Sequence, residues 1–254
     1  MSKIGIIGGS GLDNPDILEK PSEVAIDTPY GDPSSNIKEG VIGGQNVAIL
    51  ARHGIEHTIL PTNINFRANI WALKKIGCTH ILASTAVGSL RKSIEPGHIV
   101  FPNQFIDFTK QRISTFHDAD KVVHTPMAEP FCQSTMEILR ETATEMSIPN
   151  HVNKTIVTIE GTRFSTKSES HMFRSWGADI INMSSCPEVA LAREQKIHYA
   201  ALAMSTDYDC WKEDEESVSW ELIEKTMKKN AANVIAIFLK AIPKLTNWKD
   251  KCSF

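Results

Sequence analysis

Several features are scarce or missing in this sequence of 254 residues, and each absence narrows the class of protein. No apolar run approaches the roughly 20 residues that a membrane-spanning helix needs, and the first residues show no basic segment followed by an apolar one. The five cysteines are scattered, odd in number and free of C-x-x-C spacing, which argues against a disulfide framework and a zinc ribbon. We therefore expect a soluble, cytoplasmic protein that binds no metal.

Charge of one sign is not in excess either, because 27 Lys and Arg residues stand against 30 Asp and Glu residues. Without a broad positive field, binding to nucleic acid or to an anionic membrane is not expected. The sequence also lacks internal repeats and long linkers. We expect residues 1–254 to form a single domain. Any anion that it binds must be held by a few nearby residues and not by a broad positive surface.

What the sequence does contain is an alternation of short β-branched apolar runs with longer segments of helical spacing. Strands are predicted at residues 4–7, 47–50, 79–84, 98–101, 155–159, 179–182 and 198–204, and helices at 63–75, 130–146, 168–176, 187–195 and 217–242. This order is typical of an α/β fold with a central mixed, mostly parallel β-sheet flanked by helices. Ligands of such sheets bind beyond the carboxyl ends of the strands.

The first predicted strand ends in glycines, in the segment GIIGGSG at residues 5–11. Asn14 stands where a dinucleotide-binding loop has its third glycine, which disfavours an NAD-dependent oxidoreductase. The Lys followed by Ser or Thr that a nucleoside triphosphate loop requires is missing as well. This loop fits neither fingerprint and is more typical of a smaller anion site.

Hydrogen-bond donors follow three of the predicted strands. Ser10 follows the first strand, Arg52 and His53 follow the second, and Thr85 with the backbone of Ala86 follows the third. A guanidinium fork, hydroxyls and close backbone N–H groups together suit a small tetrahedral anion. Taken singly, each residue also fits an ordinary turn or surface loop.

The segment HGIEH places His53 and His57 four residues apart, as in some metal sites. A zinc protease motif has Glu directly after the first His, whereas this sequence has Gly54. Contact of His53 with an anion and a structural hydrogen bond for His57 are therefore the preferred interpretations.

Two carboxylates follow the last predicted strand, Asp207 and Asp209 in TDYDCW. In an extended chain they face the same way. In a covered site their repulsion and desolvation raise the pKa of at least one, which makes it a proton donor near neutral pH. The other carboxylate can stay ionised and accept from an amino group. A solvated acidic loop is the alternative interpretation.

Other candidates lie near two further strand ends. Ser184 and Ser185 precede a predicted helix, where a hydroxyl either caps the helix or joins its N–H groups in binding an anion. Phe164 and Ser165 can supply a flat wall and a hydrogen bond, and Met183 can supply a soft apolar surface.

These segments together resemble the trimeric purine nucleoside phosphorylases. The resemblance covers nearly the whole chain and is carried by IGIIGGSGLDNP, LARHGIEHTILP, NINFRANIWALKKIGCTHILASTAVGSLR, PMAEPFC, VTIEGTRFST, WGADIINMSSCPEVALARE and STDYDCWKE. It implies the nucleoside phosphorylase fold, a homotrimer with sites shared between subunits, and no cofactor, since orthophosphate is a co-substrate.

The resemblance also implies a role for each matching residue. Phosphate is expected at Ser10, Arg52, His53, Thr85, Ala86 and Ser184; the base at Asp207, Asp209, Phe164 and Ser165; and the ribose at Met183 with Asn182 beside it. His124 resembles a residue that reaches a neighbouring subunit's pocket. Trp220 stands where small aliphatic residues usually border the 5′ substituent, and Ser184 stands where the family usually has Thr.

The expected reaction is phosphate-dependent cleavage of 5′-methylthioadenosine to adenine and 5-methylthioribose 1-phosphate, with Asp207 as the proton donor to purine N7. A broader phosphorylase that accepts adenosine, deoxyadenosine or methylthioinosine is the alternative within the fold. A nucleoside-binding protein without turnover is the alternative from another class.

Overall fold

The computed structural model describes residues 3–9, 12, 16–117, 122–212, 220–245 and 252, with the backbone alone for residues 220–225. The strands in this part of the chain are β1 (Lys3–Gly8), β2 (Glu19–Val24), β3 (Ile37–Ile42), β4 (Gln45–Ala51), β5 (Cys78–Ser89), β6 (Ile99–Phe108), β7 (Asn150–Ile159), β8 (Ile180–Asn182) and β9 (His198–Asp207). The helices are α1 (Phe66–Lys75), α2 (Gln133–Glu145), α3 (Lys167–Ser175), α4 (Ser185–Glu194) and α5 (Trp220–Leu245), with short 3₁₀ turns at Pro61–Asn63 and Asp209–Trp211.

The described strands form a sheet in the order β2-β3-β4-β1-β5-β8-β7-β6-β9, and β9 also pairs with β5. This extra pairing closes β5, β8, β7, β6 and β9 into a ring. Parallel pairs join β1 to β4 and β5, β5 to β9, and β7 to β6 and β8. Antiparallel pairs join β3 to both its neighbours, β5 to β8, and β6 to β9. The prediction of a mixed, mostly parallel sheet is confirmed.

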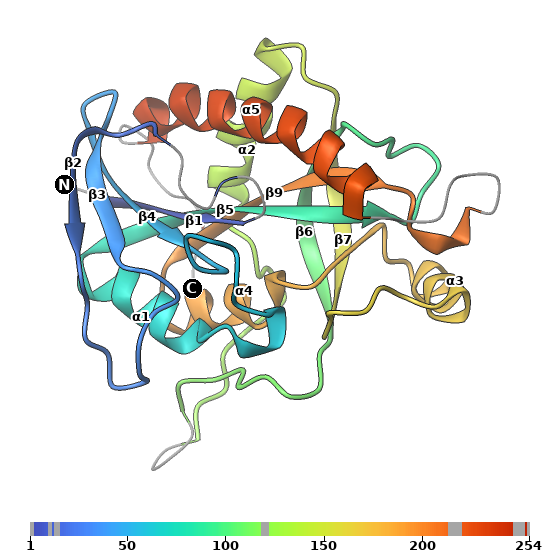
Figure 1. The fold of residues 1–254 in the computed structure, drawn as a ribbon, viewed down its shortest axis with the longest axis horizontal. Helices are drawn as coiled ribbons and strands as arrows, with labels where there is room; N and C mark the ends of the chain where they lie inside the picture. The colour runs from blue at the N-terminus through green and yellow to red at the C-terminus, as the bar shows by residue number, and fades with distance from the viewer. Residues whose placement is uncertain are drawn as a thin grey trace.

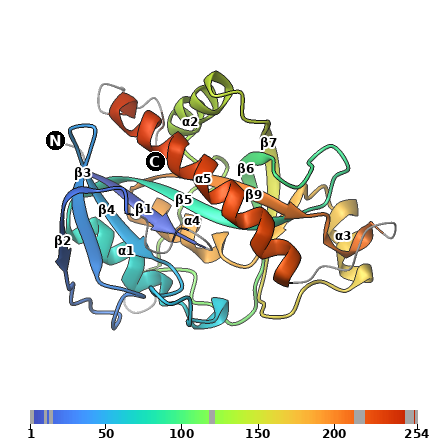
Figure 2. The ribbon, with the colours of Figure 1, turned by 45° about the horizontal axis from the view of Figure 1, so that its top comes forward.

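Helices cover both faces of the sheet. Helices α2 and α5 lie on one face, and α1 and α4 lie on the other, while α3 lies at the far end beside β7 (Figure 1). Figure 2 shows α5 running across the strands. None of the described helices is long and apolar enough to cross a membrane.

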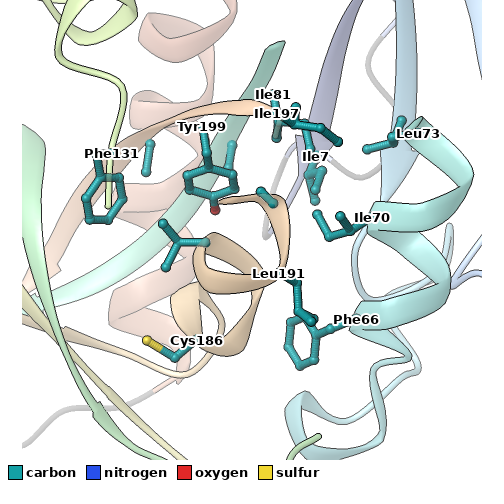
Figure 3. Packing of buried hydrophobic residues seen from close by; sticks show 14 of the residues in the cluster. Ile7, Phe66, Ile70, Leu73, Ile81, Phe131, Cys186, Leu191, Ile197 and Tyr199 are labelled. Carbon is teal, nitrogen blue, oxygen red and sulfur yellow. The ribbon is translucent and has the colours of Figure 1, made fainter. Parts of the chain in front are cut away.

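The alternation of side chains along the strands produces the two main core layers. In β1, Ile4 and Ile6 pack with α2 and α5, whereas Ile7 packs with α1 and α4. Figure 3 shows the second layer, in which Ile7 lies near Leu73 and Ile70 of α1. Because both faces of β1 are buried, the strand reads as a continuous apolar run in the sequence.

The strands differ from the sequence prediction in several details. β6 runs to Phe108 and not to residue 101, and β7 begins at Asn150 and not at residue 155. β2 and β3 were not predicted, because their exposed or half-buried polar residues lack a strong apolar run. β5 runs to Ser89 and not to residue 84, so Thr85 and Ala86 lie inside the strand and not after its end. The extension is held by pairing with β8 and β9, which are distant in the sequence.

Candidate active site

A cavity of about 420 Å³ lies beyond the carboxyl ends of β1, β4, β8 and β9, beside the second half of β5. Its lining includes the predicted site residues Arg52, His53, Thr85, Ala86, Phe164, Ser165, Asn182, Met183, Ser184, Asp207 and Asp209. Among the described residues, His124 is exposed and lies outside this lining. Ser10 and the side chain of Trp220 lie outside the described part of the chain.

Arg52 is held against the cavity wall by a buried carboxylate. Its Nε and Nη2 donate to the two oxygens of Glu188 at 2.7 and 2.8 Å, and both side chains are almost completely buried. The hydroxyl of Tyr199 donates to Glu188 Oε1 at 2.6 Å, and burial raises the pKa of this tyrosine well above its usual value. The fork of Arg52 is therefore fixed before any ligand arrives.

The glycine at the end of β1 allows Arg52 to lie close to the backbone. A Cβ atom on Gly9 would stand 2.6 Å from Arg52 Nη1 and 2.8 Å from the carbonyl oxygen of Ser84. Nη1 of Arg52 donates to that carbonyl at 2.7 Å, and the N–H of Gly9 donates to Ser84 Oγ at 3.1 Å. Gly9 thus makes room for a guanidinium, and a dinucleotide is not needed to explain this glycine.

The loop after β4 orients His53. Its Nδ1 lies 2.9 Å from the carbonyl oxygen of Ile59, and a carbonyl can only accept, so Nδ1 carries a proton. The ring of His57 stacks on His53 with centroids 4.4 Å apart.

The buried side-chain amide of Asn182 forms hydrogen bonds with hydroxyl groups from three elements, β5, α4 and β7. Asn182 Nδ2 donates to Thr85 Oγ1 at 3.0 Å and to Ser185 Oγ at 2.8 Å, and its Oδ1 accepts from Thr158 at 2.8 Å. Ser184 Oγ lies 3.0 Å from Thr85 Oγ1. Thr85 Oγ1 accepts from this amide and donates to the carbonyl oxygen of Ala86 at 3.2 Å, so its hydroxyl is held in place beside Ser184. The Ser184 side chain makes no capping hydrogen bond to α4, so of the two interpretations the anion-binding one stays a prediction.

Asp207 ends β9 and lies in a largely buried position on the cavity wall. Burial raises the pKa of its carboxyl to about 6, against the opposing hydrogen bonds from Thr206 and the backbone of Asp209. Thr206 Oγ1 lies 2.7 Å from Asp207 Oδ2, and the N–H of Asp209 donates to Oδ1 at 2.8 Å. The group therefore titrates near neutral pH, and burial is the main cause, not repulsion by Asp209.

Asp209 reaches the same cavity by a turn and not by an extended chain. Its backbone φ is +50° at the start of the 3₁₀ turn, so the chain is not extended here. Both carboxylates line the cavity, but the extended chain that was expected to bring them there was wrong. The hydroxyl of Ser165 lies 3.1 and 3.2 Å from the two Asp209 oxygens. Burial raises the pKa of Asp209 as well. Half-exposed Phe164 forms part of the wall beside this pair.

Met183 completes the lining between the two ends of the cavity. Gly161, with φ of +76°, lies so close that an added Cβ would stand 2.6 Å from Met183 Sδ. Because Gly161 has no side chain, its backbone can lie directly against the thioether of Met183.

Sequence reasoning missed the residues that hold the candidates in place. The sequence predicts no role for Glu188 beyond its place in the helix at 187–195, puts Tyr199 and Thr158 inside predicted strands, and puts Thr206 after the strand at 198–204. Glu188, Thr158 and Tyr199 bond to partners that are 11 to 136 positions away in the sequence. The partner of Thr206 is the adjacent Asp207. The one available signal was an unpaired Glu in the otherwise apolar start of α4.

Comparisons with known proteins agree with this geometry. A sequence model described as the phosphorylase superfamily matches residues 3–243. The S-methyl-5′-thioadenosine phosphorylase of Danio rerio is 55% identical over 248 residues, which are 96% of this chain and 89% of the relative. The enzyme of the same name from Drosophila melanogaster is 50% identical over 255 residues, 98% of this chain and 88% of the relative.

Solved structures give the same result. The methylthioadenosine phosphorylase of Schistosoma mansoni in complex with adenine has a TM-score of 0.94 and 41% identity, with 98% of this chain and 93% of that chain covered. A methylthioadenosine phosphorylase from an antarctic soil metagenomic library has a TM-score of 0.91 and 43% identity, with coverage of 96% and 86%.

Proposed function

Because the chain belongs to the phosphorylase superfamily, we propose that it cleaves 5′-methylthioadenosine with orthophosphate, giving adenine and 5-methylthioribose 1-phosphate. It is then a pentosyltransferase of purine and methionine salvage. The observation that carries the proposal is a cavity that holds a carboxyl of raised pKa, Asp207, together with a cluster of anion donors around Arg52. Near-full-length relatives named for this reaction support it.

Phosphate is proposed to bind where the arginine, imidazole and hydroxyl groups meet. The proposed ligands are Ser10, Arg52, His53, Thr85, the backbone of Ala86, and Ser184. The Glu188 carboxylate fixes the plane of Arg52 and the carbonyl of Ile59 fixes the ring of His53, so little side-chain freedom is lost when the anion binds. The anion is both the ligand of this cluster and the nucleophile of the reaction.

The adenine ring is proposed to lie between Phe164 and the two aspartates. As the bond from C1′ to the purine breaks, its electron pair moves onto the base, and a proton from Asp207 to N7 neutralises that charge. Asp209 accepts from the 6-amino group, with Ser165 holding its carboxylate in orientation. A phosphate oxygen then forms the new bond to C1′, where positive charge has built up.

The remaining contacts are proposed for the sugar and for neighbouring subunits. Met183 lies against the ribose, and Trp220 borders the 5′ substituent. We propose that the single domain of residues 1–254 assembles as a homotrimer, in which exposed His124 reaches the cavity of a neighbour. The reaction uses no cofactor and no metal, its partners are small molecules and not nucleic acids or membranes, and the enzyme acts in the cytoplasm.

The direct test is a panel of nucleosides incubated with the protein with and without phosphate, with release of free base as the readout. Methylthioadenosine should release adenine only when phosphate is present. Base release without phosphate would contradict phosphorolysis and indicate a hydrolase. Equal rates with adenosine, deoxyadenosine or methylthioinosine would indicate the broader phosphorylase.

Replacement of Asn182 by Asp should raise the KM for phosphate by about tenfold or more, because an ionised Asp cannot donate to Thr85. The change should leave the KM for nucleoside nearly as it was. Steady-state kinetics with each substrate varied in turn measure both values. Thr158→Val, which removes the hydrogen bond to the amide oxygen, should give a smaller change in the same direction. A change confined to the nucleoside KM would assign Asn182 to the ribose instead.

A further inference from the structure

A second cluster of reactive side chains lies away from the cavity. In the described part of the chain, Cys132, His198 and Cys252 are the residues that bring three potential metal-ligand atoms together, all within 4.8 Å of one another. The two sulfur atoms are 3.1 Å apart. The five cysteines had been read from the sequence as scattered, with no metal site, and these two are 120 positions apart.

Two of the three residues are held by the framework of the fold. Cys132 directly precedes α2, and its N–H donates to the carbonyl oxygen of Tyr199 at 2.8 Å, which ties it to the start of β9. His198 opens β9, and its ring stacks on His80 with centroids 4.8 Å apart. Asp207 ends the same strand of ten residues, so the cluster lies about 30 Å from the acid of the cavity.

The sulfur atoms also have hydrogen-bond donors of their own. Thr135 Oγ1 donates to Cys132 Sγ at 3.2 Å, and the N–H of Ser134 donates to Cys252 Sγ at 3.4 Å. Ser134 Oγ lies 3.2 Å from the same sulfur. Donors of this kind stabilise thiolates and orient the ligands in metal sites. Cys252 is only partly buried, which leaves a path for an ion to enter.

We propose that Cys132, His198 and Cys252 bind a zinc ion. Two sulfurs and an imidazole are ligands that zinc prefers, and a water molecule or Ser134 Oγ can occupy the fourth tetrahedral position. Two thiolates on tetrahedral zinc stand about 3.8 Å apart, so the observed pair needs to open by only a fraction of an ångström. A disulfide would join only the two sulfur atoms, whereas a metal ion would also bind the imidazole of His198. The bound ion joins residue 252 to the beginnings of α2 and β9.

The test uses the full-length protein, reduced and freed of metal with a chelator, and titrated with Zn²⁺ in competition with a chromophoric chelator. One equivalent should bind and should raise the thermal midpoint. Co²⁺ in its place should give the absorption of sulfur-to-metal charge transfer. Cys252→Ala should lower the zinc affinity by more than the ~10–100-fold typical of losing an outer-shell partner, because it removes a ligand.

Cys78→Ala is the matched control, since it removes a buried thiol of β5 outside the cluster and should keep the affinity unchanged. The Cys252 variant alters a residue near the end of the chain, and circular dichroism of both variants checks that they fold. Failure of the wild type to compete for zinc overturns the proposal. So does equal loss of affinity in the two variants, or a Cys132–Cys252 disulfide, seen by mass, in a protein that binds no zinc.

Discussion

Replacement of Asp207 by Asn should reduce turnover of methylthioadenosine by more than about 100-fold at saturating phosphate. Asn keeps the shape of the side chain and can still accept from the N–H of Asp209 and donate to Thr206 Oγ1. What it loses is the proton that the leaving purine needs at N7. The measurement is steady-state release of adenine, with the KM for phosphate expected to stay nearly unchanged.

Asp209→Asn is the matched control for this experiment. Asn tolerates the positive φ at position 209, so the turn is preserved while the acceptor for the 6-amino group is altered. Its main effect should be on the KM for nucleoside and on the preference for adenine over 6-oxopurines. A rate for Asp207→Asn equal to that of the wild type would remove Asp207 from the mechanism.

The raised pKa of Asp207 has a consequence for stability as well. Its pKa moves from 3.8 to about 6 in the folded protein, so between these values the folded state holds a proton that the unfolded state has released. The stability that a neutral Asp207 contributes is therefore complete below about pH 4 and is lost as the pH rises through 6. Relative to Asp207→Asn, the wild type should lose about 2 kcal/mol of unfolding free energy between pH 4 and 7. Urea unfolding without phosphate measures it.

Removal of the buried carboxylate in Glu188→Ala should lower the free energy of unfolding by about 3–5 kcal/mol. The change leaves the Arg52 guanidinium buried without its main counter-charge, since the two side chains are 1% and 0% exposed. It also removes the two hydrogen bonds that hold the Arg52 guanidinium in one orientation, so the KM for phosphate should rise. Urea unfolding and phosphate-dependent kinetics measure the two effects separately.

Two comparisons separate the ion pair from general packing. Tyr199→Phe removes one hydrogen bond to the carboxylate and should cost only about 1.5–3 kcal/mol. The double variant Arg52→Met with Glu188→Leu removes both charges and should recover much of the stability, but not phosphorolysis. A loss below about 1 kcal/mol in Glu188→Ala would contradict a fixing role for the pair.

Local patterns were sufficient for much of the fold and for the choice of candidate residues. Continuous apolar runs predicted the buried strands, and helical spacing predicted a helix at residues 168–176, which the structure has as α3. The polar residues that follow β4, β8 and β9 predicted the edge of the sheet that carries the cavity. These signals are local, because they depend on neighbours in the chain and on the period of the secondary structure.

The path of β5 shows where such reasoning stops. Thr85 and Ala86 look like residues after a strand, because polar and small side chains interrupt the apolar run. The strand nevertheless continues to Ser89, because β8 and β9 supply backbone partners on both sides. Pairing between strands that are about a hundred residues apart leaves no trace in local composition.

The amino-acid sequence alone defines the groups that can do chemistry here: the glycines after β1, Arg52, the hydroxyls, and the two aspartates of TDYDCW. The protonation and orientation of these groups depend on the folded chain. Burial, more than repulsion by Asp209, raises the pKa of Asp207, and Glu188 from α4 fixes Arg52 across 136 positions of sequence. Solvent exclusion and buried ion pairing depend on what the folded chain brings together, and no single segment contains that information.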